Sequence, residues 1–263
     1  GCTDMDMALE GLHEETGPGV LEAAITVDTA LNAADKAALF KTFTKIMAQK
    51  NGMMATFMAK CSADWPGQSG HIHMSLKSKD GAAAFFDDDT SDGMSPLMRH
   101  FVGGQQKLMP EMLAMIASTV NSYTRLIPGY WAPTNATWGV DNRTCALRVI
   151  PGSATSQRVE YRVAAADANP YLALAASLAC GYLGIVEKLE PSAPVEGSAY
   201  DKGTRELPRS LTEALVQLDR CEPLREIFGD RFVRAYLSVK EKENENFLQV
   251  ISSWEREYLL LTV

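Results

Sequence analysis

The clearest pattern along the chain is the alternation in residues 157–163, which read QRVEYRV. Successive side chains of a strand point to opposite faces, so one face would carry Arg158, Glu160 and Arg162, and the other would meet a core. A solvated outer face of an edge strand explains such a row when it stands alone. Here, however, five arginines surround this glutamate: Arg125, Arg143, Arg148, Arg158 and Arg162. This density predicts a site for phosphates and carboxylates, with Glu160 as a metal ligand or charge partner.

A second alternation, GHIHMSL over residues 70–76, would place His71, His73 and Ser75 on one face of a strand. Two histidines two positions apart are compatible with a metal or phosphate site, although exposed histidines on a sheet are the commoner explanation. Shorter patterns predict further strands over residues 53–58, 137–140 and 144–150.

Helical spacing of apolar residues predicts a helix over Ala33–Lys50 and another over Met94–Ser118, interrupted near Gly103-Gly104 and at Pro110. Asn169-Pro170 opens a long apolar helix, with Asn169 as the N-cap. Ser210 begins a further helix, and Glu213 three residues later predicts a capping box. Helices are also expected over 223–228, 230–244 and part of 251–258.

The turn Gly17-Pro18-Gly19 separates Glu15 from Glu22. If two short strands flank the turn, these carboxylates lie side by side, which favours a divalent cation between them. Two surface glutamates beside a turn remain the simpler interpretation. The proline-rich segment Asn121–Pro133 predicts a long loop, and long loops inside domains commonly serve binding.

Composition narrows the class of protein. The 263 residues carry a net charge of −8 with a pI of about 5.1, which argues against a general nucleic-acid binder. Five scattered cysteines without CxxC spacing are typical of reduced thiols in a cytoplasmic protein. The longest apolar run, Tyr171–Val186, contains a serine and two glycines and indicates a buried helix rather than a membrane span.

Five motifs stand in the order and spacing of one family: GPGxxE, GHIHMSL, NSYTRLIPG, DNRTCALRVIPG and RVEYRVAAADANPYL. With the C-terminal WEREYLLLTV, they make the chain resemble the glutamine synthetase family along its whole length. The resemblance implies an α+β fold, in which a curved, largely antiparallel sheet carries the charged residues and helices pack outside. It also implies that residues 1–263 are a catalytic domain that lacks the family's N-terminal small β-domain and two further metal-binding glutamates.

The family makes a γ-glutamyl amide: ATP phosphorylates the side chain of glutamate, and an amine or ammonia then displaces phosphate. The resemblance implies Mg²⁺ or Mn²⁺ as metal and a homo-oligomer as the intact protein. It implies that Arg143 and Arg148 neutralise the transferring phosphoryl group. The other implied roles are Glu15, Glu22, His71 and Glu160 for metal, Arg125, Arg162, Gly67 and Trp131 for glutamate or amine, and His73, Ser75 and Arg158 for nucleotide.

Two positions depart from the family pattern. Trp131 stands where ammonia-using members usually carry a glutamate, and Val20 replaces a common glutamine. Tryptophan cannot accept a proton but offers an apolar, cation-binding surface, which favours a larger amine over ammonia. We therefore expect a glutamate–amine ligase in which this chain alone is inactive, with ammonia still open as the nucleophile. A non-catalytic structural or regulatory member of the family is the alternative.

Overall fold

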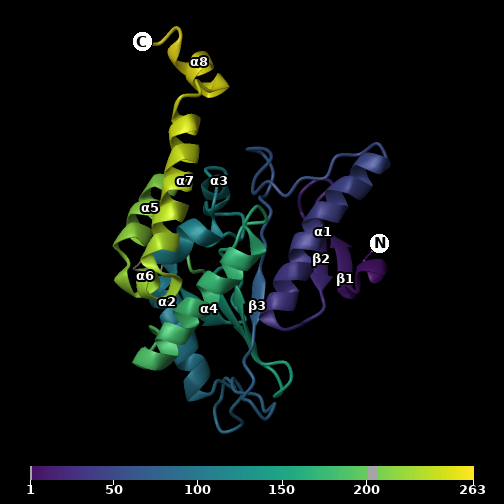
Figure 1. The fold of residues 1–263 in the computed structure, drawn as a ribbon, viewed down its shortest axis with the longest axis vertical. Helices are drawn as coiled ribbons and strands as arrows, with labels where there is room; N and C mark the ends of the chain where they lie inside the picture. Colours follow the sequence, from purple (N-terminus) through teal and green to yellow (C-terminus); the bar gives the residue numbers. More distant parts are fainter. Residues whose placement is uncertain (1, 201–205) are drawn as a thin grey trace.

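A computed structural model describes residues 2–200 and 206–263 (Figure 1). Its strands are β1 (Leu9–Glu14), β2 (Leu21–Ile25), β3 (Ile72–Met74), β4 (Trp138–Val140), β5 (Leu147–Ile150) and β6 (Arg158–Tyr161). Its helices are the 3₁₀ turn η1 (Thr3–Met5), α1 (Ala30–Lys50), α2 (Pro96–Ile116), α3 (Ser122–Arg125), α4 (Pro170–Glu187), α5 (Leu211–Arg220), α6 (Glu222–Phe228), α7 (Asp230–Leu248) and α8 (Ser253–Leu259).

The central sheet has the strand order β3-β6-β5-β4. β6 pairs antiparallel with both β3 and β5, whereas β4 joins β5 in parallel. Val159 and Tyr161 of β6 are fully buried in the hydrophobic core, together with residues of α2, α4 and α5. The alternation in residues 157–163 therefore arises because one sheet face meets this helical layer. The predicted α+β class with a largely antiparallel sheet is confirmed.

Two helices, α2 and α4, form the main packing layer, and their glycines let the backbones approach closely. A Cβ on Gly104 would lie 2.2 Å from the carbonyl oxygen of Cys180, and one on Gly184 would lie 2.1 Å from that of His100. The predicted interruption at Gly103-Gly104 and Pro110 is wrong, because α2 runs unbroken from Pro96 to Ile116. The glycines serve helix–helix contact, and burial of both helices outweighs the cost of one internal proline.

The predicted strand at residues 53–58 is also wrong, since the segment is irregular and Met54 is 89% exposed. An isolated extended segment has no neighbouring strand to satisfy its backbone groups, so apolar content alone does not make a strand. The predicted cap of α4 is confirmed, because Asn169 accepts hydrogen bonds from the N–H groups of Tyr171 and Leu172. At α5, the Ser210 hydroxyl accepts a hydrogen bond from the N–H of Glu213, as a capping box requires. The Glu213 carboxylate, however, accepts from the N–H of Arg209 rather than from that of Ser210, so the predicted capping box is only half formed.

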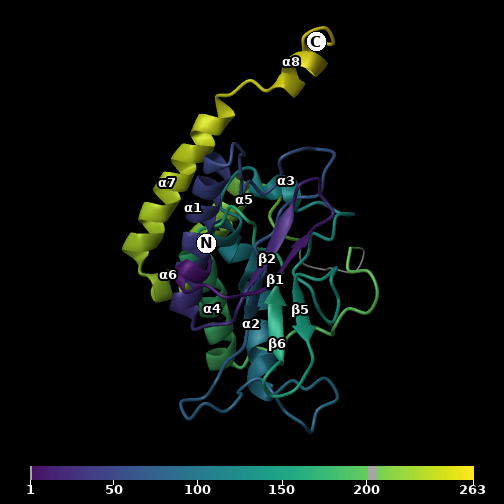
Figure 2. The same ribbon diagram turned by 90° about the vertical axis from the view of Figure 1, so that its right-hand side faces the viewer.

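The two ends of the chain lie on different parts of the body. The β1–β2 hairpin forms a separate two-stranded sheet beside α1, and α1 also packs on α4 (Figure 1). α7 runs along the helical layer and leads to α8, which stands clear of the rest in both views (Figures 1 and 2). α4 is long and apolar enough to pass a length-and-composition test for a membrane span, as core helices of soluble proteins also do.

Candidate active site

The face of the sheet away from the core carries a row of charged side chains centred on β6. Glu160 pairs across the sheet with His73 of β3 on one side and with Arg148 of β5 on the other. Residues directly opposite one another in a sheet lie on the same face, so these three side chains form one continuous row. The register thus brings the motif around His73 next to the two later motifs that carry Arg148 and Glu160.

Glu160 is only 3% exposed, and its two carboxylate oxygens serve several partners. Oε1 lies 2.7 Å from Nη1 of Arg162, 3.2 Å from Nδ1 of His71 and 3.8 Å from Nε2 of His73. Oε2 lies 3.2 Å from Nη1 of Arg148. A buried carboxylate needs such partners, because an unpaired charge in this environment is strongly unfavourable.

The same contacts fix the protonation states of this group. Burial acts to raise the pKa of Glu160, but the hydrogen bond with His71 and the charge of Arg162 outweigh it and hold the pKa well below its usual range. Desolvation lowers the pKa of His71 to about 4, against the opposing effect of Glu160. At neutral pH the site therefore holds an ionised carboxylate beside a neutral imidazole, the forms that bind metal ions.

The arginines surround this carboxylate in different ways. Arg148 also contacts Asp141, at 2.8 Å, and Arg162 donates from Nε to the carbonyl oxygen of Arg143 at 3.1 Å. Arg158 donates from Nε to Nδ1 of His73 at 3.2 Å. The side chain of Arg143 is exposed and has no hydrogen bond or ion pair among residues 2–200 and 206–263. With respect to this part of the chain, its guanidinium group is available to an anion.

Ser75, the remaining member of the second alternation, follows directly after β3 and is exposed. Its hydroxyl makes no hydrogen bond within the described part of the chain. It lies two positions after His73, just beyond the end of that strand.

A second polar group sits on the β1–β2 hairpin, where Glu15 and Glu22 come together as the turn predicted. His13 is the cross-strand partner of Glu22, and its Nε2 lies 3.1 Å from Oε1 of Glu15 and 3.5 Å from Oε2 of Glu22. One ligand atom from each of the three residues lies within 4.8 Å of the others. Two carboxylates and one imidazole are a suitable donor set for a divalent cation.

The two carboxylates of the hairpin behave differently from one another. Partial burial and the nearby Glu15 raise the pKa of Glu22, and the charge of Glu160 raises it further. Burial also acts to raise the pKa of Glu15, but hydrogen bonds with Glu22 and His13 outweigh it and lower the pKa. Both carboxylates would gain from a cation between or beside them.

Arg125 and Gly67 lie against each other. A Cβ on Gly67 would come within 2.4 Å of Cγ of Arg125 and 2.7 Å of the carbonyl oxygen of Ala59. Arg125 is 4% exposed, and its guanidinium donates to the carbonyl oxygens of Val163 and Ala164, just beyond β6. Desolvation lowers its pKa to about 10, so it stays charged. Gly67 is thus required at this position for close packing with Arg125.

Trp131 lies at the surface. Its side chain is 63% exposed and its φ is +56°, a left-handed conformation that is uncommon for a large residue. Its carbonyl oxygen accepts a hydrogen bond from Nη2 of Arg162 at 3.4 Å. The loop backbone is therefore tied to the charged site, while the indole is turned outward.

The comparison with protein families decides the assignment. The model of the glutamine synthetase catalytic domain matches residues 1–259. The chain belongs to the glutamine synthetase family. It is 47% identical over 258 residues to type-1 glutamine synthetase 2 of Dictyostelium discoideum, covering 96% of this chain and 49% of that protein. It is 41% identical over 255 residues to glutamate–isopropylamine ligase of a Pseudomonas species, covering 96% and 56%.

A solved structure of GmaS in complex with ADP has the same fold, with a TM-score of 0.91 and 32% identity. The alignment covers 98% of this chain and 61% of that one. The chain thus spans about half the length of the curated relatives it matches.

Sequence reasoning does not predict two residues that the structure places in these polar groups. No role is assigned to His13 from the sequence, although the hairpin register that pairs it with Glu22 follows from the turn. Asp141 follows β4 and shares Arg148 with Glu160. No sequence pattern pointed to Asp141, because its contact depends on the parallel pairing of β4 with β5.

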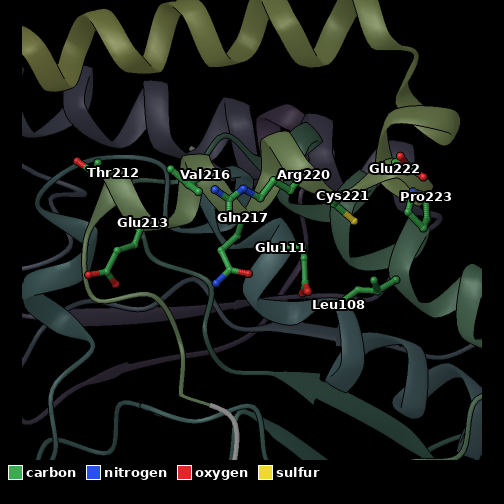
Figure 3. Close-up of a pocket in the computed structure, with 10 residues that line it drawn as sticks. All are labelled: Leu108, Glu111, Thr212, Glu213, Val216, Gln217, Arg220, Cys221, Glu222 and Pro223. Atoms are coloured by element: carbon green, nitrogen blue, oxygen red, sulfur yellow. The ribbon is translucent and has the colours of Figure 1, made fainter.

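A surface groove of about 680 Å³ lies away from these groups, between α2 and the α5–α6 segment (Figure 3). Its charged lining residues are Glu111, Glu213, Arg220 and Glu222. It shares no residue with the charged row or the hairpin group, and three glutamates do not suit phosphate or carboxylate binding.

Proposed function

We propose that this chain is the catalytic domain of an ATP-dependent ligase that joins glutamate to an amine through γ-glutamyl phosphate. The observation that carries the proposal is the ionised Glu160 at the centre of a face lined by arginines and histidines. Phosphoryl transfer needs positioned positive charge around the equatorial phosphoryl oxygens rather than covalent chemistry from the protein. The exposed Arg143 and the half-buried Arg148 are suited to that task.

Two metal positions fit the residues present. Glu15 and Glu22, with His13, would hold one Mg²⁺ or Mn²⁺, and His71 with Glu160 would hold another. The metals would neutralise phosphate charge and orient the nucleotide. His73, Ser75 and Arg158 lie at or near the β3–β6 edge, where they would contact the nucleotide.

Glutamate would bind beside the arginines at the other end of the face. Arg125 and Arg162 would bind its carboxylates, and Gly67 would lie beside it. Carbonyl oxygens already hold the guanidinium group of Arg125, and Glu160 holds that of Arg162, so little side-chain conformational entropy would be lost on binding.

The nucleophile in this proposal is an organic amine rather than ammonia. The exposed indole of Trp131 offers a face to an alkylammonium group, whereas it cannot accept a proton. A relative whose name records isopropylamine as substrate supports this choice. A second relative is named a glutamine synthetase, so ammonia stays the competing nucleophile.

We also infer that the active protein is a homo-oligomer. The final segment exposes a series of large apolar side chains: Phe247, Leu248, Val250, Ile251, Trp254, Tyr258, Leu260, Leu261 and Val263. Exposed apolar surface of this extent is typical of contact between subunits. The metabolic role would place the enzyme in the cytoplasm.

The test is phosphate release from ATP in the presence of glutamate, with ammonium, isopropylamine, ethanolamine and putrescine compared. It uses the 263-residue chain and the whole protein that contains it, and we expect turnover by the chain alone to be slight. Glu160→Gln should abolish release, whereas Glu187→Gln, on the exposed end of α4, should not. Release that needs no glutamate, or that survives Glu160→Gln, would overturn the proposal. A whole protein that folds but releases no phosphate with any amine would favour a non-catalytic, structural or regulatory member.

A further inference from the structure

Lys60 is a buried lysine that the proposed reaction does not use. Its side chain lies between two loops and is 7% exposed. Nζ donates to the carbonyl oxygen of Trp65 at 2.9 Å and stands 4.4 Å from the centre of the Tyr130 ring. Among residues 2–200 and 206–263, no carboxylate lies within 4.0 Å of this ammonium group. The cation is therefore bound by a carbonyl dipole and an aromatic face.

The backbone of Lys60 reaches a third segment. Its N–H donates to Oδ1 of Asn121 at 2.9 Å, and Nδ2 of Asn121 donates back to its carbonyl oxygen at 3.0 Å. Asn121 immediately precedes α3, which carries Arg125 at its end. The carbonyl oxygen of the preceding Ala59 accepts from the N–H of Gln68, next to Gly67. One residue thus joins the segments that carry Gly67, Arg125 and Trp131.

If this side chain only filled space, an apolar residue would do so at a lower desolvation cost. Burying an ammonium group is unfavourable unless its surroundings compensate for lost water, and methionine would fill similar space without that cost. The charge is useful only for what it orders, namely the direction of the Tyr130 ring and the position of the Trp65 carbonyl group. Both features lie next to residues proposed to bind substrate.

We propose that Lys60 is a positioning residue that sets the distance between the glutamate-binding groups and the amine-facing loop at Tyr130 and Trp131. The inference rests on the proposed ligase function and extends it to amine selectivity. Without the ammonium group, the 126–133 loop would lose its tie to the 62–69 loop. Arg125 would keep its contacts with Val163 and Ala164. Binding of the amine should therefore weaken more than binding of ATP.

The experiment compares Lys60→Met with Lys60→Arg in the whole protein, and Lys50→Met at the exposed end of α1 is the matched control. We expect Lys60→Met to raise KM for the preferred amine roughly tenfold, the scale of one desolvated cation–π contact. KM for ATP should change less than about twofold, and Lys60→Arg should recover part of the loss. Tyr130→Phe should be neutral, whereas Tyr130→Leu should resemble Lys60→Met and add little to it in the double variant.

A readout that does not need activity is amide hydrogen exchange of the 263-residue chain. Lys60→Met should speed exchange over residues 62–69 and 126–133 and leave that of α4 unchanged. An equal rise of KM for amine and ATP, or faster exchange throughout, would reduce Lys60 to a general structural role and overturn the inference. A wild-type protein without ligase activity but with the expected exchange pattern would instead contradict the proposed function alone.

Discussion

The two polar groups of this site are built in opposite ways. Glu160 is buried in the middle of a four-stranded sheet, and each of its oxygens meets a cation or an imidazole. Glu15 and Glu22 lie on a two-stranded hairpin with exposed side chains, and His13 lies near both. The charge of Glu160 in the sheet is already balanced by protein side chains, whereas the carboxylates of Glu15 and Glu22 in the hairpin carry excess negative charge. The side chains around Glu160 are therefore held in place by the protein alone, and an added cation would stabilise the hairpin carboxylates more.

The largest loss of stability is expected when Glu160, the carboxylate with the most charged partners, is removed. Glu160→Ala would leave Arg162 and Arg148 facing each other without their shared carboxylate, and should lower the free energy of unfolding by about 3–5 kcal/mol. Urea unfolding measures this change. Glu22→Ala is the matched variant in the hairpin and should stabilise the metal-free chain or leave it unaltered, because it relieves repulsion with Glu15. Equal losses in both variants would remove the contrast between the two groups.

Lowering the pH should also reduce the stability that the residues around Glu160 provide. The pKa of His71 is about 4 in the folded chain and 6.5 ordinarily, so the unfolded chain binds more protons between these values. Stability therefore falls as pH decreases across this window, by about 1–3 kcal/mol, and the lowered pKa of Glu160 adds to the loss below 4.5.

Urea unfolding at a series of pH values, with chelator present, tests this dependence. His71→Gln should flatten the dependence between pH 6.5 and 4, whereas His100→Gln on α2 should not. An unchanged slope in His71→Gln would mean that His71 is not the titrating group.

The loop beside Arg125 is tightly packed, whereas the hairpin strand β1 is not, and a glycine-to-alanine substitution in each region tests this difference. Gly67→Ala would force a Cβ into Arg125 and the Ala59 carbonyl group, and should cost about 1–3 kcal/mol of stability. Gly11→Ala in β1 meets nothing within 4 Å and should be near neutral. Thermal or urea unfolding compares the two. If Gly67→Ala is harmless, the contact between the 62–69 loop and Arg125 is looser than the structure indicates.

The sequence predicts the strands of the sheet better than the contacts between distant segments. Alternation identified β6 and β3 because a sheet with one buried face imposes period two on its residues. The same reasoning failed at residues 53–58, since a strand also needs a neighbour. It failed at Gly103-Gly104 because Gly104 packs closely on α4 and Gly103 on Leu189 just after it. Asp141 and Lys60 could not be found from sequence, because their partners come from segments whose proximity is set only by the tertiary fold.

The smallest expected effect concerns metal at the hairpin. If His13 supplies a third ligand, His13→Ala should weaken Mn²⁺ binding by about tenfold, as removal of one ordering or ligating group commonly does. Glu14→Gln is the control, because Glu14 is adjacent in β1 but pairs with Leu21 and has its side chain on the other face. Calorimetric titration of the 263-residue chain measures both. A stronger loss with Glu14→Gln than with His13→Ala would mean that the ion is bound on the opposite face. No change in either would leave Glu15 and Glu22 as the hairpin's only ligands, and would return His13 to the role of a charge partner.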